Sequence, residues 1–190
     1  MARGGRQRAR IGVLLIVGLW GAACSRAKVF LGPDVTFPRL DSARDQFQYA
    51  ADYDRSMLVG SDAKKVEERS RYKIAAYQMV LDHFPDDQIY APLAEAAIAN
   101  CYFKMKDYGR TIRIYKSLEE RSPNYPFVHA QAEWMMGRSH DALGESAEAK
   151  RHYKRCIDTF QYHKNEEIKT FVGLCREQYI APSVPARSRK

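Results

Sequence analysis

The chain has 190 residues, which is enough for one compact domain or a short array of repeats. Hydrophobic residues make up 45% of it and charged residues 28%, which excludes a disordered chain, a collagen-like chain and a membrane bundle. The formal net charge of +8 comes mostly from the two ends, because residues 1–23 hold four arginines, residues 181–190 hold three basic residues, and neither segment holds an acid. The body between them is nearly neutral, so no nucleic-acid partner is expected.

The first segment, residues 1–23, has the pattern of a secretory signal peptide. Its arginines precede the apolar run Ile11–Ala23, and small residues end that run just before Cys24. The run has 13 residues, whereas a helix needs about 20 to span a bilayer. We therefore expect export of the mature chain rather than a permanent membrane span.

The residues Leu19–Cys24 resemble a bacterial lipobox, in which the cysteine becomes the first mature residue and is acylated through its sulfur. The resemblance implies a covalent lipid on Cys24, no other cofactor, and attachment to a membrane through that lipid. Gly21 departs from the usual leucine, so ordinary cleavage and secretion, or retention of the apolar run as an anchor, stay open as alternatives. Ser25 resembles the residue that permits sorting to the outer membrane, which implies a periplasm-facing location there.

The next segment, residues 24–40, is predicted to be the anchor cysteine followed by an extended tether. It lacks helical periodicity and contains Pro33 and Pro38. The alternative is that its apolar residues pack on the first helix; these are Val29, Phe30, Leu31 and Phe37.

Residues 41–179 are predicted to be helical, because apolar residues recur at intervals of three and four with little strand-like alternation. Breakers such as Pro85 and Gly144 separate the expected helices. The predicted helices are Ser42–Leu58, a longer helix from the loop at Gly60–Asp62 to about His83, Leu93–Lys104, Tyr108–Arg121, Ala130–Leu143, Ser146–Phe160 and Asn165–Tyr179.

Three series of residues recur with a period of 38, which indicates a repeat architecture. The prolines at 85 and 123 are separated by the same interval. Small residues follow each member of the second series, and small residues at such positions let helix axes approach each other. The series are Tyr77, Tyr115 and Tyr153; Ile98, Met136 and Leu174; and Asn100, Arg138 and Arg176.

These residues resemble the tetratricopeptide repeat (TPR), which places a large apolar residue and a small one in its first helix, and a small residue and an aromatic in its second. Met136, Gly137, Ala149 and Tyr153 match one unit in this way. The resemblance implies an all-α fold: a right-handed solenoid of antiparallel helix pairs over residues 41–179, with a terminal capping helix.

Together with the lipobox-like start, the repeats resemble the TPR lipoproteins of the outer-membrane β-barrel assembly machine (BamD-like). The periplasmic coordinator of the Tol–Pal system is the second choice. Either resemblance implies a scaffold that binds an envelope protein or a peptide segment. The alternative is an exported peptidoglycan-associated or cell-division accessory factor.

In such an array the first helix of each repeat lines a concave face where extended peptides dock. A basic stripe on this face would recognise the carboxylates of an acidic or C-terminal segment, because the planar guanidinium binds both oxygens. The alternative is a solvated face with local pairing, such as Arg138 with Asp141. The expected peptide-binding residues are Leu93, Asn100, Phe103, Lys104, Trp134, Arg138, Asp141, Lys169 and Arg176.

Cysteine usage leaves two interpretations open. Cys156 and Cys175 fall on adjacent predicted helices and form the candidate disulfide pair, whereas Cys101 has no candidate partner. The favoured alternative is that these cysteines are buried free thiols that pack as small hydrophobic residues. His152 and Cys156 are four residues apart, but no second pair accompanies them, so no metal site is expected.

No catalytic function is expected, because the chain has no phosphate-binding glycine loop, no nucleophile elbow and no convergent pair of acids. The last segment, residues 180–190, is predicted to be a flexible basic tail. The sequence therefore predicts a lipid-anchored TPR scaffold in the cell envelope.

Overall fold

The computed structural model describes residues 36–56 and 63–181. The predicted signal peptide, Cys24 and most of the basic tail lie outside these residues. The described residues form seven α-helices and no strand. The helices are α1 (Ala43–Ser56), α2 (Ala63–His83), α3 (Tyr90–Lys104), α4 (Tyr108–Arg121), α5 (Pro126–Leu143), α6 (Ser146–Phe160) and α7 (Glu166–Ile180).

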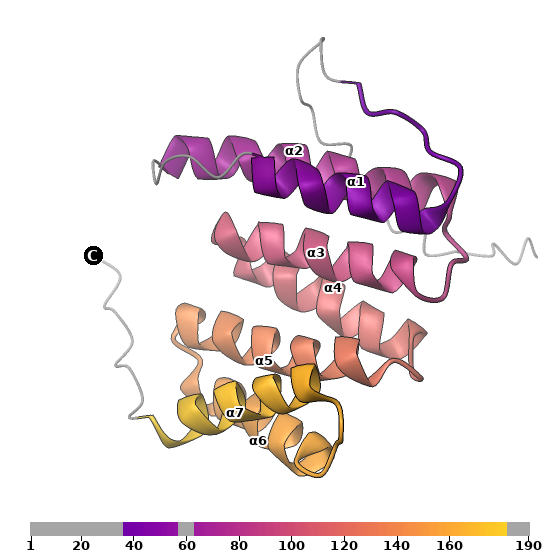
Figure 1. The fold of residues 1–190 in the computed structure, drawn as a ribbon. Helices are drawn as coiled ribbons and strands as arrows, with labels where there is room; N and C mark the ends of the chain where they lie inside the picture. Colours follow the sequence, from indigo (N-terminus) through magenta and orange to yellow (C-terminus); the bar gives the residue numbers. More distant parts are fainter. Residues whose placement is uncertain (1–35, 57–62, 182–190) are drawn as a thin grey trace, which may run out of the picture.

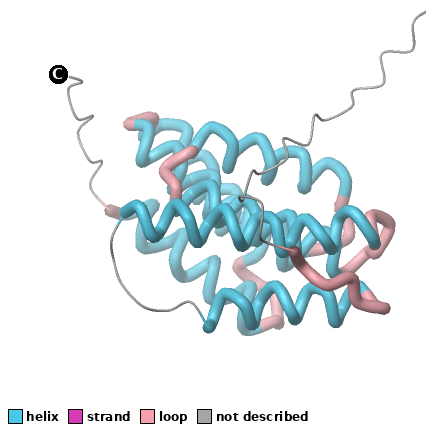
Figure 2. The backbone as a smooth tube through the Cα atoms, turned by 90° about the horizontal axis from the view of Figure 1, so that it is seen from above, coloured by secondary structure: helices cyan, strands magenta, loops and turns pink. Residues whose placement is uncertain are grey.

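The helices form antiparallel pairs that stack one after another from α1–α2 to α5–α6, and α7 closes the array (Figure 1). Successive first helices contact each other directly, as α1 with α3, α3 with α5 and α5 with α7. Within the described residues, the backbones of α2 and α4 do not approach each other in this way, nor do those of α4 and α6. The first helices therefore form the inner layer of the stack, which Figure 2 shows from above. The predicted all-α array of helix pairs is confirmed.

Two helices begin earlier than the sequence predicts. Helix α3 begins at Tyr90 rather than Leu93, because the Asp87 carboxylate accepts hydrogen bonds from the backbone N–H groups of Ile89 (3.0 Å) and Tyr90 (2.6 Å). Helix α5 begins at Pro126 rather than Ala130. Proline is favourable at the first helical position, since the N–H that it lacks has no partner there.

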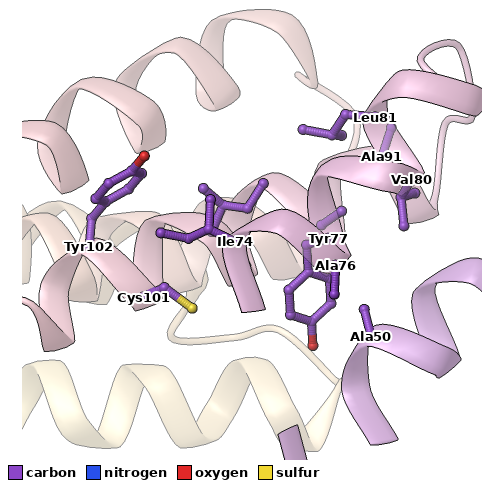
Figure 3. Packing of buried hydrophobic residues seen from close by; sticks show 11 residues of the cluster. Ala50, Ile74, Ala76, Tyr77, Val80, Leu81, Ala91, Cys101 and Tyr102 are labelled. Carbon is purple, nitrogen blue, oxygen red and sulfur yellow. The ribbon is translucent and has the colours of Figure 1, made fainter. Parts of the chain in front are cut away.

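The core consists of three clusters, one for each helix pair with its neighbours. Figure 3 shows the first cluster, in which Tyr77 and Ile74 of α2 pack with residues of α1 and α3. The aromatic residues of the 38-residue series are the centres of these clusters: Tyr115 and Tyr153 are 0% and 1% exposed. Each pair thus completes its core only against its neighbours, which is the behaviour of a repeat array.

Gly137 of α5 shows why a small residue recurs in the series. A Cβ atom at this position would lie 2.7 Å from Cδ1 of Tyr153. The Tyr153 ring cannot withdraw, because it is buried and its hydroxyl donates to Oδ2 of Asp141 at 2.7 Å. The absence of a side chain at Gly137 therefore lets α5 and α6 approach each other closely.

The described end of the predicted tether, residues 36–40, lies against the first helix. Gln46 of α1 is fully buried; its amide donates to the carbonyl of Pro38 (3.1 Å) and accepts from the N–H of Leu40 (2.9 Å). Phe37 packs against the first core cluster. The array therefore fixes this part of the chain, and any free tether lies further towards the N-terminus.

Candidate functional site

A row of aromatic side chains runs across the inner layer from α3 to α7, and we call it the inner aromatic surface. Its members are half-buried, and each contacts the next side chain or a shared neighbour. Trp134 and Phe171 have ring centroids 5.6 Å apart, and Phe171 and Phe127 have centroids 5.7 Å apart. The surface consists of Phe103 of α3, Phe127 and Trp134 of α5, and Phe171 of α7.

Arg138 lies in the middle of the inner aromatic surface. Its guanidinium carbon is 4.6 Å from the ring centroid of Phe103 and 4.9 Å from that of Trp134, so two cation–π contacts hold it. Among the described residues, no carboxylate lies within ion-pair distance of Arg138. A guanidinium positioned by rings keeps its N–H donors free for an incoming acceptor.

Two residues of the predicted peptide-binding set serve the core instead. Asn100 accepts a hydrogen bond from the hydroxyl of Tyr115 (2.8 Å), and Asp141 accepts one from the hydroxyl of Tyr153. Burial raises the pKa of both tyrosines well above its usual range, so both hydroxyls remain donors. The alternative pairing of Arg138 with Asp141 is wrong, because Asp141 is directed to Tyr153.

Of the other predicted residues, Leu93 is half-buried and packs against the second core cluster, whereas the three cations besides Arg138 are solvated. Lys104 and Arg176 are exposed, and Lys169 is bound to Glu166 one turn away, with Nζ 2.7 Å from Oε1. An exposed pair of this kind contributes little to stability, and a stronger acceptor can displace it. Only Arg138 is therefore fixed in place, and the other cations form a solvated margin around it.

Sequence reasoning missed two members of the inner aromatic surface, Phe127 and Phe171. Phe127 lies in the first turn of α5, a turn that the predicted helix did not include. Phe171 matches a packing position of the repeat, and that match gave no indication of a surface role. The 38-residue register was the available signal, because it places Phe171 one repeat after Glu133, beside Trp134.

The three described cysteines are buried free thiols in this structure. Cys156 and Cys175 lie together in the third core cluster, and their mutual hydrogen bond, with burial, raises the pKa of Cys175 far above its usual range. His152 is directed to Glu133 of α5, with Nδ1 2.8 Å from Oε2, while the Cys156 thiol donates to the carbonyl of Ala130. Over residues 36–56 and 63–181, no three potential ligands come together to hold a metal ion.

None of the helices in the described residues combines the length and the apolar character that crossing a bilayer requires.

The family comparison falls on the helix pair that carries Trp134, Arg138 and Tyr153. Residues 131–161 match the tetratricopeptide repeat. This segment covers most of α5 and all of α6, and it is the unit in which Met136, Gly137 and Tyr153 follow the expected pattern. With seven stacked helices in the described residues, the fold is an all-α, TPR-like helical repeat. No curated protein and no solved structure matches the chain.

Proposed function

We propose that the chain is a lipid-anchored, periplasm-facing scaffold of the outer membrane that holds a segment of another envelope protein on its inner aromatic surface. TPR repeats generally mediate protein–protein interactions, and this fold suggests a scaffold. The role in the assembly of outer-membrane proteins rests on the resemblance of the repeats and the lipobox-like start to the lipoproteins of that machine.

The observation that carries the binding proposal is the position of Arg138. Its guanidinium is half-buried between Phe103 and Trp134 and has no carboxylate partner among the described residues. A cation held in this way loses little freedom when a carboxylate binds, so the binding free energy is not spent on ordering it. The surrounding rings add apolar area of the kind that dominates binding hot spots.

The ligand that fits this surface is an extended segment with one acidic side chain or a C-terminal carboxylate. Its carboxylate would lie on Arg138, where two parallel N–H···O bonds are available. Apolar side chains next to the carboxylate would contact Trp134 and Phe171. The exposed cations Lys104 and Arg176 would attract the same ligand at longer range.

The anchoring proposal rests on the N-terminal segment alone. Several acyl chains on Cys24 would hold the protein firmly, because each buried methylene contributes about 0.8 kcal/mol. The residues between Cys24 and Phe37 would then link the membrane to the array.

Site-specific photo-crosslinking in cells tests the binding proposal. A photoreactive residue replaces Lys104, which is exposed on α3 at the margin of the inner aromatic surface. The matched control carries the same residue in place of Lys116, which is exposed on α4 in the outer layer. We expect a crosslinked partner protein from position 104 and none from position 116. Equal crosslinking from both positions, or none from 104, would contradict the proposal.

A further inference from the structure

A second group of charged side chains lies where α4, α5 and α6 meet, and we call it the junction cluster. It consists of Glu119 of α4, Glu133 of α5, and His152 and Arg155 of α6. The Glu133 side chain is only 5% exposed and that of Glu119 only 18%. In the repeat register, the same position holds Glu95 in the preceding unit and Phe171 in the next one. A carboxylate thus recurs at this position in two units and is replaced by an aromatic ring in the last.

One guanidinium serves both carboxylates of the junction cluster. Nε of Arg155 contacts Oε1 of Glu133, and Nη2 of Arg155 lies 3.5 Å from Oε2 of Glu119. The second oxygen of Glu133 lies 2.8 Å from Nδ1 of His152. Polar contacts therefore connect three successive helices across the boundary between two repeats.

The second histidine of this region extends the contacts to the end of α5. The rings of His140 and His152 are stacked, with centroids 5.1 Å apart and planes inclined by 13°. Nδ1 of His140 lies 2.6 Å from Oε2 of Glu145, in the loop that follows α5. The stacked rings thus connect the C-terminal turn of α5 to α6, the two helices of one repeat.

The charges of the junction cluster do not balance without a titrating proton. Its two carboxylates meet one permanent cation, that of Arg155. Neutrality therefore requires one proton bound within the cluster. Leaving a buried negative charge without compensation is costly, because burial removes the hydration that stabilises it. The fold therefore favours binding one more proton than the unfolded chain would hold.

We propose that the junction cluster is a pH-sensitive latch between repeats: a proton bound by its two carboxyl groups joins α4 to α5, and its loss in alkaline solution weakens that junction. The latch does not depend on what the inner aromatic surface binds. It acts on α5 because Glu133 is part of that helix, next to Trp134.

The electrostatics of Glu119 agree with this geometry. Burial and then the charge of Glu133 raise the pKa of Glu119 to about 8, while Arg155 opposes the rise. The other titratable groups that act here are Glu120 of α4, which also raises the pKa of Glu119, and Cys175 of α7, which is influenced by Glu133 and Cys156. A carboxyl group whose pKa is raised on folding stabilises the fold fully below its ordinary pKa of 4.5. That stabilisation is lost as the pH rises through about 8.

Thermal unfolding of the full chain between pH 5 and pH 9.5 tests the latch. Glu119→Gln keeps the shape of the protonated side chain and cannot ionise, whereas Glu177→Gln removes the same charge from an exposed position on α7 outside the junction cluster. We expect the Tm of the wild type and of Glu177→Gln to fall together as the pH rises. Relative to both, the Tm of Glu119→Gln should be higher at pH 9 and should depend less on pH. A curve for Glu119→Gln parallel to that of the wild type would overturn the proposal.

A direct titration keeps the proposal testable if the variants unfold. In the wild-type chain with ¹³C-labelled glutamate carboxyl groups, one resonance should titrate well above pH 6, and it should be absent from Glu119→Gln. If every glutamate carboxyl titrates below pH 5.5, the latch does not exist.

Discussion

At the scale of single residues, close packing of the helices depends on small residues that face a buried tyrosine. Gly137 allows the Tyr153 ring to fill the space between α5 and α6, and Ala99 lies at the same register position in the preceding repeat, where Tyr115 is the buried aromatic. Sequence reasoning could predict this pairing of small and aromatic residues, because both recur every 38 residues. It could not predict the hydroxyl partners, since Tyr115 uses Asn100 while Tyr153 uses Asp141.

We expect Gly137→Ala to destabilise the protein by about 2 kcal/mol, which is typical of overpacking a rigid core. The new methyl group would overlap the ring of Tyr153, and this outweighs the gain in helix propensity of about 1 kcal/mol. Chemical denaturation measures the effect. The control is Gly173→Ala in α7, where no atom lies within 4 Å of the added Cβ and stability should be unchanged or slightly higher. Equal stability of Gly137→Ala and the wild type would show that α6 can move away.

At the scale of helices, the breakers and the 3.6-residue period were sufficient to place every described element. Tyr108–Arg121 and Ser146–Phe160 have the predicted bounds. The errors are at the starts of α3 and α5, each of which has a proline in the first turn. Proline is compatible with a first turn, because the N–H groups there have no partner within the helix.

The contacts between helices were less predictable than the helices. The register predicts that Arg138 and Arg176 lie on the first helices, but not that Arg138 lies between two rings or that Asp141 is directed to the core. The junction cluster was missed entirely, because Glu119 and Glu133 are separated along the chain and neither belongs to a recognised motif. Only packing brings α4, α5 and α6 together and places both carboxylates on Arg155.

At the scale of the whole molecule, the net charge and the proposed binding site lie in different parts of the chain. Most of the net charge of +8 lies in the terminal segments, and the repeat body is nearly neutral. The proposed binding site therefore depends on one positioned cation rather than on bulk charge. The first described residues lie against α1 at the start of the array, and α7 closes its other end (Figure 1).

The proposed anchor gives a prediction at the same scale. Metabolic labelling with a radioactive fatty acid should label the wild type, which should fractionate with membranes. Cys24→Ala should carry no label and should appear in the soluble fraction, while Cys101→Ala, a buried cysteine of the core, should be labelled normally. An unlabelled, soluble wild type would contradict lipid attachment.

The proposed binding of an acidic segment on the inner aromatic surface depends on Arg138, with Arg176 at its margin. The most direct measurement is the yield of the crosslinked partner from position 104 in the double variant Arg138→Glu, Arg176→Glu, with the Tm measured in parallel. Arg176 is exposed and Arg138 is half-buried, so the Tm should fall only by what the two cation–π contacts of Arg138 contribute, about 0.5–1 kcal/mol each. We predict that the crosslinked partner disappears while the variant remains folded. An undiminished yield in the folded double variant would contradict the binding of a carboxylate at Arg138.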